Sequence, residues 1–398
     1  MKNRDIIVVG LQPWDIEIGS NCKNIAMELS GSNRILYVNR ALDRISSIRN
    51  KNDKKVQQRL RSIKGEISDL EEVQKNLWVL NPRVILESVN KLPAFLFNYF
   101  NRLNNRRLAS AISDAAARLG FENPILFIDN DFFRAYHLPE MLDVSASIYY
   151  IRDYLVEQPY FEKHGPAMEQ GLMKKVTMVA ANSAYLAKYA SKYNPHSLDI
   201  GQGCDFSLFQ KTSYPLPADL ASIPSPRIGY VGALISSRLD IALLESVAEK
   251  CPDWSIVLVG PEDEAFRNSR LHHMSNVYFP GSKKPEQLPD YIAGFDVCIN
   301  PQLVNKLTTG NYPRKIDEYL ALGKPVVATF TEFMRSFQDY VYLSRDADEF
   351  IDVVKLALAE DPAADWKEKR MEFALSHTWE NSVKRLSQAF EQLEPVNA

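Results

Sequence analysis

A lysine and a glutamate stand three residues apart in a segment whose pattern suits the binding of an anion. Lys315 and Glu318 belong to residues 311–329, which the pattern predicts to be a short helix followed by a buried strand. A cation in the first turn of a helix is unfavourable, because that end of the helix dipole is positive. A phosphate bound there would reverse the effect, since free N–H groups and an ammonium together suit its charge. The alternative is a solvated lysine on a surface helix.

The sequence also indicates where that helix begins and ends. Pro313 suits the first helical position, where its missing N–H has no partner in any case. Gly323 suits the left-handed residue that follows a last helical turn. Ile316, Tyr319 and Leu320 recur at helical spacing and predict one buried stripe.

Length and composition limit the classes of protein. A chain of 398 residues is too long for one ordinary core and favours two domains. A net charge of -3 gives no general attraction to nucleic acid. The apolar run at the N-terminus is too short for a signal peptide, and no segment approaches the roughly 20 apolar residues that span a bilayer. We therefore expect a cytoplasmic protein. Four scattered cysteines lack metal-site spacing and predict reduced, mostly buried thiols: Cys22, Cys204, Cys251 and Cys298.

Strands and helices alternate along most of the chain, which predicts parallel sheets with helices on both faces. A proline-rich segment without periodicity, 213–226, divides two such series and suggests a linker. The fold class is therefore α/β, with two doubly wound, Rossmann-like domains facing across a cleft. The predicted parts are an N-terminal Rossmann-like domain at 1–212, the linker at 213–226, a C-terminal Rossmann-like domain at 227–375, and a terminal helix at 376–398 that packs back toward the first domain.

Ligands of open parallel sheets bind beyond the carboxyl ends of the strands. The cleft should therefore be lined by the loops that follow Gly10, Tyr150, Gly232, Gly260 and Asn300. The last of these loops leads directly to Lys315 and Glu318.

Two segments of the first domain have an unusual composition. Residues 40–64 are rich in Arg and Lys, which indicates a mobile loop or a solvated helix, or else a basic patch facing an anionic membrane or a phosphate-bearing acceptor. Residues 93–107 place aromatic and aliphatic side chains before arginines, so they form an interfacial amphipathic helix or simply part of the core.

Seven segments together resemble the GT-B glycosyltransferases, of bacterial surface-polysaccharide or teichuronic-acid type. One of them has the Pro-x-Lys-x-x-Glu-Tyr form of a donor motif that is common in this branch, and it begins at Pro313. The resemblance covers nearly the whole chain, and the segments occur in the family's order. They are YYIRDY (149–154), AANSAYL (180–186), IGQGCDFSLF (200–209), RIGYVGALISSRLD (227–240), SIVLVGP (255–261), PGSKKPEQLPDYIAGFDVCINP (280–301) and PRKIDEYLALGKPVVAT (313–329).

The resemblance implies a donor site. Glu318 matches the second carboxylate of the family's paired glutamates, which accepts hydrogen bonds from the nucleotide ribose. Lys315 and Arg238 would contact the diphosphate. Gly232 belongs to the glycine loop that opens the donor domain, and Gly19 would let the loop of the acceptor domain approach the diphosphate, unless it is only a turn glycine.

Two positions depart from the family pattern. The first paired glutamate falls at Gly310, and the usual arginine after the donor-domain glycine is Ala233. Recognition of the sugar hydroxyls and stabilisation of the phosphates must therefore differ here. Neutral hydrogen bonds from the loop before Pro313 are one substitute, supplied by Asn305, Thr308 and Thr309.

Asp153 and His164 are the catalytic candidates of the first domain. A histidine is a natural proton acceptor near neutral pH, although a lone histidine is more often structural.

The resemblance implies transfer of a sugar from a nucleotide-diphosphate sugar, with a UDP-sugar favoured, to a glycan or lipid-linked acceptor. It implies retention of the anomeric configuration, no cofactor and no metal, because cationic side chains and amides would stabilise the leaving diphosphate. The alternatives are a nucleotide-sugar epimerase on the same fold and a non-catalytic nucleotide-sugar-binding subunit of a polysaccharide assembly. Peripheral contact with an anionic membrane at the inner face of the cell membrane is a further expectation, and binding of nucleic acid is not expected.

Overall fold

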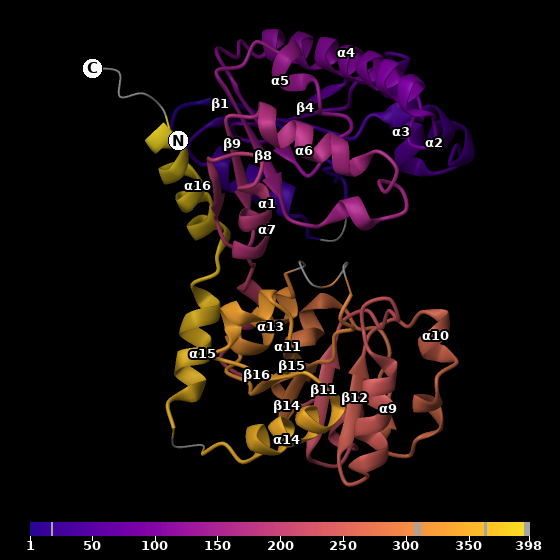
Figure 1. Cartoon of the computed structure of the whole chain (residues 1–398), viewed down its shortest axis with the longest axis vertical. Helices are drawn as coiled ribbons and strands as arrows, with labels where there is room; N and C mark the ends of the chain where they lie inside the picture. The colour runs from indigo at the N-terminus through magenta and orange to yellow at the C-terminus, as the bar shows by residue number, and fades with distance from the viewer. Residues whose placement is uncertain (17–18, 306–307, 309–311, 362–363, 394–398) are drawn as a thin grey trace. The chain divides into compact units, whose positions relative to one another are not determined.

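Two α/β units make up the chain in the computed structural model, which describes residues 1–16, 19–305, 308, 312–361 and 364–393 (Figure 1). Unit 1 comprises Met1–Gly201 and Trp379–Ala398, and unit 2 comprises Gln202–Thr378. The α/β class predicted from the alternating pattern is confirmed.

Unit 1 is built on an eight-stranded sheet in the order β10-β9-β8-β7-β1-β2-β5-β4, in which only β4 runs antiparallel to its neighbour. Its strands are β1 Asp5–Gly10, β2 Arg34–Val38, β4 Leu70–Gln74, β5 Leu77–Leu80, β7 Ile125–Asp129, β8 Ala146–Ile151, β9 Met178–Ala181 and β10 Ser197–Asp199, with a separate pair β3 Leu42–Asp43 and β6 Ile85–Leu86. Its helices are α1 Asn21–Ser30, α2 Arg44–Arg49, α3 Lys54–Ile63, α4 Ala94–Arg118, α5 Leu138–Met141, α6 Gly165–Lys175, α7 Ala184–Ala190 and α16 Trp379–Leu393.

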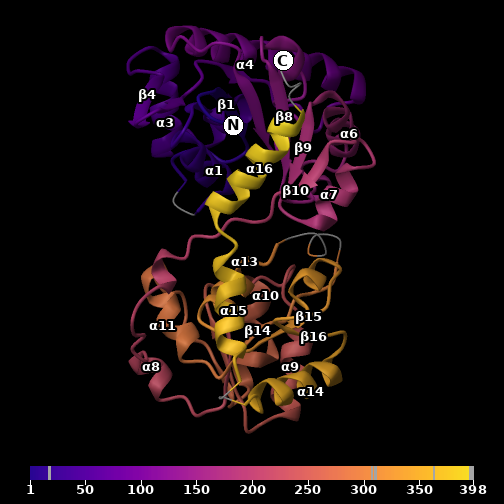
Figure 2. The same cartoon turned by 90° about the vertical axis from the view of Figure 1, so that its left-hand side faces the viewer.

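Successive side chains of β1 point to opposite faces of the sheet and so belong to two different cores, as the period of a strand requires. Ile6 and Val8 pack with α1 and α16 on one face, and Ile7 and Val9 pack with α4, α6 and α7 on the other. The last long helix, α16, lies beside α1 (Figure 2). The two ends of the chain thus complete the same face of one sheet.

Unit 2 contains a six-stranded, fully parallel sheet in the order β13-β12-β11-β14-β15-β16. Its strands are β11 Arg227–Val231, β12 Ser255–Val259, β13 Val277–Tyr278, β14 Val297–Asn300, β15 Val326–Thr329 and β16 Tyr342–Ser344. Its helices are α8 Ala218–Ala221, α9 Ile241–Lys250, α10 Glu264–Arg267, α11 Leu288–Ala293, α13 Arg314–Ala321, α14 Ala347–Leu358 and α15 Trp366–Leu375. Helices α11, α13 and α15 cover one face, and α9 and α14 cover the other.

Each sheet has one topological switch point. Strands from the first part of the unit's sequence lie on one side of this point, and strands from the later part lie on the other side. In unit 1 this point lies between β1 and β7, and in unit 2 it lies between β11 and β14. Loops at the carboxyl ends of two such strands part in opposite directions, which leaves room for a ligand between them. The two pairs of loops are therefore the places to look for sites.

The structure divides the chain earlier than the expected linker at 213–226. The change of unit falls between Gly201 and Gln202. Within the expected linker, Leu220 and Ile223 are buried in the core of unit 2. Prolines break the periodicity of this segment without freeing it from the core, because isolated apolar side chains still anchor it.

The basic segment 40–64 forms helices α2 and α3 rather than a mobile loop. Lys55 donates to the backbone carbonyl of Asp15, and Arg59 pairs with the Asp15 carboxylate at 2.8 Å. Of residues 93–107, all but Pro93 lie in α4, where Phe97 is buried while Phe95 stays exposed. No helix in the part of the chain that the structure describes is both long and apolar enough to cross a membrane.

Gly229 provides a test of how tightly unit 2 is packed. An ideal Cβ at this position in β11 would lie 2.1 Å from the ring of Phe295, which is itself buried. We expect Gly229→Ala to destabilise unit 2 by about 1–3 kcal/mol, because the core cannot make room without strain. Urea unfolding measures the loss, and hydrogen exchange of β11 assigns it to unit 2. Gly31→Ala is the control, since its nearest contact would lie at 3.4 Å, and equal unfolding midpoints for both variants would contradict the packing argument.

Candidate functional site

Helix α13 carries the two residues singled out by the sequence. The stripe predicted for it is confirmed, because Ile316, Tyr319 and Leu320 are fully buried. The helix ends at Ala321, and Gly323, two residues further on, has a φ of +68°. The N–H of Gly323 donates to Leu320, and the next N–H along the chain donates to Tyr319. This is the glycine-terminated helix end expected from the sequence.

A buried hydrogen bond holds α13 against the end of β11. The backbone N–H of Val231, the last residue of β11, donates to the hydroxyl of Tyr319 at 2.9 Å. The donor would otherwise be buried without a partner, which is unfavourable by about 1–3 kcal/mol. The bond therefore fixes the first turns of α13 beside the loop that follows β11.

Lys315 and Gly232 lie together at this junction. The Lys315 ammonium sits 4.7 Å from the ring centroid of Tyr230. A Cβ added to Gly232 would lie 3.3 Å from Lys315 Nζ, and the φ of this glycine is +144°. Among the described residues no carboxylate pairs with Lys315. The site therefore presents a lysine held over an aromatic face, next to backbone that a side chain would cover.

The ends of β11 and β12 are also in close contact. A Cβ on Gly260 would lie 1.9 Å from the carbonyl oxygen of Gly232. Only a glycine fits there, so the two glycine loops named from the sequence meet in one place.

Glu318 lies one turn further along α13 and is half-buried. Within the described part of the chain its carboxylate has neither a hydrogen bond nor an ion pair. Burial raises the pKa of Glu318, with opposing effects from the nearby charges of Arg314 and Lys315 and a small further rise from Asp317. A carboxylate kept without a partner in such a place is available to accept hydrogen bonds from a ligand.

Asp317 was not singled out by the sequence, yet it is the best-bonded carboxylate of the helix. It is fully buried. It accepts from the hydroxyl of Tyr312 at 2.6 Å, lies 2.8 Å from Nδ1 of His377, and contacts the thiol of Cys204 at 3.4 Å. It thereby ties α13 to two segments more than 50 residues away on either side. No local pattern distinguishes it from the neighbouring Glu318.

The loops after β11 and β14 are bonded to each other. The N–H of Leu303 donates to the carbonyl of Arg238 at 2.8 Å, and the side-chain amide of Asn305 donates to the carbonyl of Ser237 at 3.1 Å. The Arg238 side chain is exposed, and the described residues supply no partner for it. Its position on this loop, at the switch point, suits the role expected of it.

Thr308 has a structural position. It is buried, and its hydroxyl donates to the carbonyl of Leu303. The N–H of Thr308 donates to the side chain of Asn305, while the N–H of Asn305 donates to the Thr308 hydroxyl. These bonds shape the loop and leave the Thr308 hydroxyl little capacity for a sugar. Thr309 and Gly310 lie outside the described residues, and Ala233 is exposed.

The three site residues predicted in unit 1, Asp153, His164 and Gly19, differ from one another in their surroundings. Asp153 is a third exposed and pairs with Arg152 at 2.6 Å. His164 is buried, with Nε2 2.9 Å from the carbonyl oxygen of Leu92 and its ring stacked on Phe97 at 4.0 Å. This is the geometry of a packed histidine, the alternative that the sequence left open. Gly19 is exposed and precedes the residue that caps α1.

A second carboxylate accompanies Asp153 at the same edge. Asp129, the last residue of β7, is fully buried and accepts from Arg152 at 2.9 Å. The side chain of Asn130, at a φ of +53°, accepts from the N–H of Arg152. The signal for this group was present in the sequence as three polar residues, Asp-Asn-Asp, directly after an apolar strand.

The pattern Asp-x-Asp occurs twice in the chain, and in both cases the carboxylates already interact with other groups of the protein. Asp129 pairs with Arg152, and Asp131 pairs with Arg134. In the second spacing, Asp346 caps α14 and Asp348 pairs with a lysine. In the described ranges no group of three or more His, Cys, Asp or Glu side chains is arranged to hold a metal ion.

Comparisons with known proteins agree with this architecture. Residues 225–360 match the family model described as Glycosyl transferases group 1, so this part of unit 2, with Gly232, Lys315 and Glu318, is a domain of that family. A Bacillus subtilis protein named as a teichuronic acid biosynthesis glycosyltransferase is 26% identical over 226 residues. That alignment covers 53% of this chain and 56% of the other, about half the length of the relative.

Solved structures match the chain from end to end. Sucrose-phosphate synthase from Thermosynechococcus elongatus has a TM-score of 0.67 at 16% identity, covering 98% of this chain and 99% of the other. The Anabaena protein HepE in complex with UDP has a TM-score of 0.66 at 14% identity, covering 98% and 100%. These likenesses show the fold, and the GT-B class predicted from the sequence is confirmed.

The environment of Glu318 predicts that this residue weakens the fold that carries it. A carboxyl with a raised pKa binds its proton more tightly in the folded state, so stability falls as pH rises from about 4.3, the usual glutamate value, through the raised pKa. We therefore expect Glu318→Gln to raise the melting temperature at pH 7.5 and to lose this advantage near pH 4. Thermal unfolding across that range measures the effect, and the exposed Glu286→Gln is the control. A destabilised Glu318→Gln at pH 7.5 would show that the carboxylate has a structural partner.

Proposed function

We propose that this protein, with its group 1 glycosyl transferase domain at residues 225–360, moves a sugar from a nucleoside-diphosphate sugar, with a UDP-sugar favoured, to a glycan or lipid-linked acceptor in cell-surface polysaccharide synthesis. One observation carries the proposal. Lys315, Gly232 and Glu318 lie at the carboxyl edge of the unit 2 sheet, at its switch point, and neither charged group has a hydrogen bond or an ion pair within the described residues.

Each group has a role in binding the donor. The carboxylate of Glu318 accepts hydrogen bonds from two ribose hydroxyls, which its free oxygens allow. Lys315 contacts the diphosphate, and the absence of a side chain at Gly232 lets phosphate oxygens approach the backbone. Arg238 adds a guanidinium from the neighbouring loop, whose fork suits two phosphate oxygens at once.

The chemistry follows from these charges. Cleavage of the bond to the sugar leaves negative charge on the diphosphate, and preorganised cations lower the free energy of that state. Lys315 and Arg238 supply this charge without a metal or other cofactor. Retention of the anomeric configuration is part of the proposal, on the likeness of Glu318 to the second of the family's paired glutamates.

The names of similar proteins support the choice of substrates. The relative from Bacillus subtilis is named for teichuronic acid biosynthesis, and HepE structures contain UDP, UDP with glucose, and UDP-glucose. They support a uridine nucleotide and a polysaccharide acceptor for this chain.

A nucleotide screen tests the donor site. With EDTA present, we expect UDP to raise the melting temperature more than GDP, dTDP, CMP or ADP does. Lys315→Ala and Glu318→Ala should each lose most of the shift, because a charge-assisted hydrogen bond contributes about 1.5–3 kcal/mol. Lys284→Ala and Glu286→Ala, on an exposed turn of the same unit, are the matched controls.

The outcome of turnover separates the alternatives. Release of free nucleotide with a glycosylated acceptor supports the transferase, interconversion of the sugar without release indicates an epimerase, and binding alone indicates a non-catalytic subunit. Absence of a shift with every nucleotide at millimolar concentration would contradict the donor site itself.

We also propose that α2 and α4 of unit 1 contact an anionic membrane surface where the acceptor is lipid-linked. Ile45 and Ile48 of α2 are 50% and 69% exposed, and Phe95 and Tyr99 of α4 are 71% and 67% exposed. The two helices are joined through Glu87, which pairs with Arg44 and whose backbone carbonyl accepts from Asn104. Apolar side chains among basic residues suit an interface with anionic lipids.

Sedimentation with vesicles tests this contact. We expect the protein to bind vesicles that contain phosphatidylglycerol at low salt and to be released as salt screens the attraction. Ile48→Glu combined with Tyr99→Glu should abolish binding. Leu356→Glu, at an equally exposed leucine of unit 2 (59%), should not, and equal binding by all variants would contradict the surface.

A further inference from the structure

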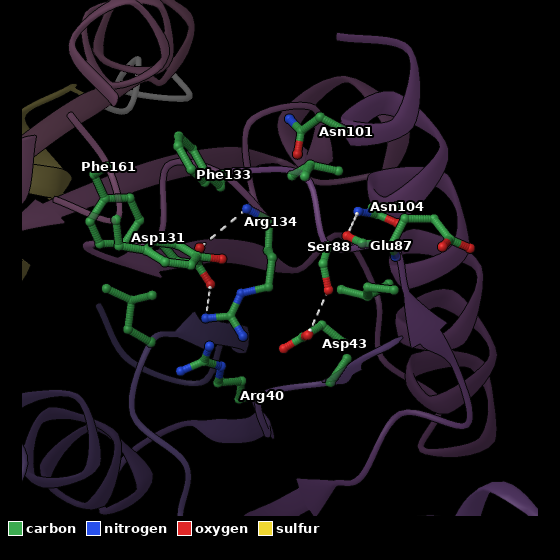
Figure 3. Close-up of a pocket in the computed structure, with 15 residues that line it drawn as sticks. Arg40, Asp43, Glu87, Ser88, Asn101, Asn104, Asp131, Phe133, Arg134 and Phe161 are labelled. Carbon is green, nitrogen blue, oxygen red and sulfur yellow. Dashed lines mark hydrogen bonds and ion pairs between the residues drawn. The ribbon is translucent and has the colours of Figure 1, made fainter. Parts of the chain in front are cut away.

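A pocket opens at the carboxyl edge of the unit 1 sheet, at its switch point. It is lined by Leu11, Arg40 and Asp131, which follow β1, β2 and β7, and by side chains of α4 and the segment 86–89 (Figure 3). The cavity measures about 40 Å³, space on the order of three water molecules. This space suits a small charged substituent, while the rest of the molecule that carries the substituent stays outside the pocket.

Two arginines reach this pocket from loops that are 94 positions apart in the chain. Figure 3 shows the guanidinium groups of Arg40 and Arg134 turned toward each other. Arg134 pairs with Asp131 at 2.7 Å, whereas the described residues offer Arg40 neither a hydrogen bond nor an ion pair. The charge of Arg134 and partial burial lower the pKa of Arg40, against opposing effects of Asp131, Tyr160 and Asp43. The two like charges would be stabilised by an anion between or beside them.

One buried polar atom in the lining of the pocket lacks a hydrogen-bond partner among the described residues. It is Nδ2 of Asn101, a residue that is only 2% exposed. Oδ2 of Asp131 and Nη2 of Arg134 are also buried, but they lie 2.7 Å apart and form the ion pair between these two residues. A buried amide is rarely left unsatisfied in folded proteins, so Nδ2 of Asn101 can donate to a ligand.

The other carboxylates of the pocket are already engaged. Asp43 accepts from the side chains of Ser46 and Ser88. Glu87 pairs with Arg44 and Arg107, which lower its pKa to about 2. The donor capacity that remains belongs to Arg40, to Arg134 and to the amide of Asn101, and it selects an anion.

Aromatic rings border the same pocket. Phe133, Phe161 and Tyr160 pack edge to face or tilted against one another, and Tyr160 is 47% exposed. Apolar faces beside a few convergent polar groups are typical of sites for small polar molecules. A sugar ring can rest on such a surface while its charged substituent enters the pocket.

We propose that this pocket binds an anionic substituent of the acceptor sugar, a carboxylate or a phosphate, with Arg40 as its main ligand and Arg134 and Asn101 as further donors. The proposal rests on the proposed function, because it takes the acceptor to be a saccharide. It adds that the acceptor carries a negative charge on the sugar that unit 1 holds.

Binding of small probes to the full chain tests the pocket. The probes are methyl β-D-glucuronide, glucose 6-phosphate, inorganic phosphate and the neutral methyl β-D-glucoside, with affinities measured by calorimetry and saturation-transfer NMR. We expect an anionic probe to bind and the neutral glucoside not to bind. Arg40→Gln should weaken the anionic probe about tenfold or more, as loss of a charge-assisted hydrogen bond does. Arg49→Gln, an exposed arginine of α2 outside the pocket, should leave it unchanged, and Arg134→Lys should weaken it with Arg40 intact.

The results distinguish the two sources of charge. Binding of the glucuronide alone assigns a carboxylate, whereas binding of glucose 6-phosphate and inorganic phosphate assigns a phosphate. Equal affinity for the neutral glucoside, an unchanged Arg40→Gln, or no binding of any anionic probe would overturn the proposal. UDP affinity measured on the same samples reports on unit 2 separately, so failure of the pocket and failure of the donor site are told apart.

Discussion

The hydrogen bond between Val231 and Tyr319 is the constraint on which the candidate donor site depends. It joins the end of a central strand to the face of a short helix, and both partners are buried. That junction helps to hold Lys315 beside Gly232, together with the bonds of Asp317 and the buried stripe of the helix. A helix of eight residues has little stability alone, so its position must come from contacts with the sheet.

Two adjacent acidic residues of α13 have opposite effects on the stability of the fold. Asp317 is buried and bonded to Tyr312 and His377, whereas Glu318 is half-buried without a hydrogen bond or an ion pair in the described chain. The first stabilises the helix, and burial of the second raises its pKa, so that its ionised form weakens the fold. Proteins retain such unfavourable groups mainly where a ligand supplies the missing interactions.

The two units follow one topological rule with different side chains. In each, polar side chains gather where parallel strands next to the switch point end. In unit 2 the group is a lysine, a glutamate and bare backbone, which suits a nucleotide. In unit 1 it is a pair of arginines with an unsatisfied asparagine and aromatic rings, which suits an anionic sugar.

The sequence by itself determined what depends on neighbouring residues. Strand and helix periodicity predicted the α/β class and most strands of both sheets, and Pro313 and Gly323 predicted the limits of α13 to within a residue or two, because these signals act within a few residues. It missed β4 and β5 at one end of the unit 1 sheet, and it placed the boundary at a proline-rich segment that the core anchors. Only the tertiary structure decided which candidate side chains are already engaged in contacts within the protein. His164 stacks on Phe97, and the Thr308 hydroxyl is bonded within its own loop. It alone brought Arg40 to Arg134 and Asp317 to His377, since long-range pairing is set by how strands order in a sheet and leaves no trace in local spacing.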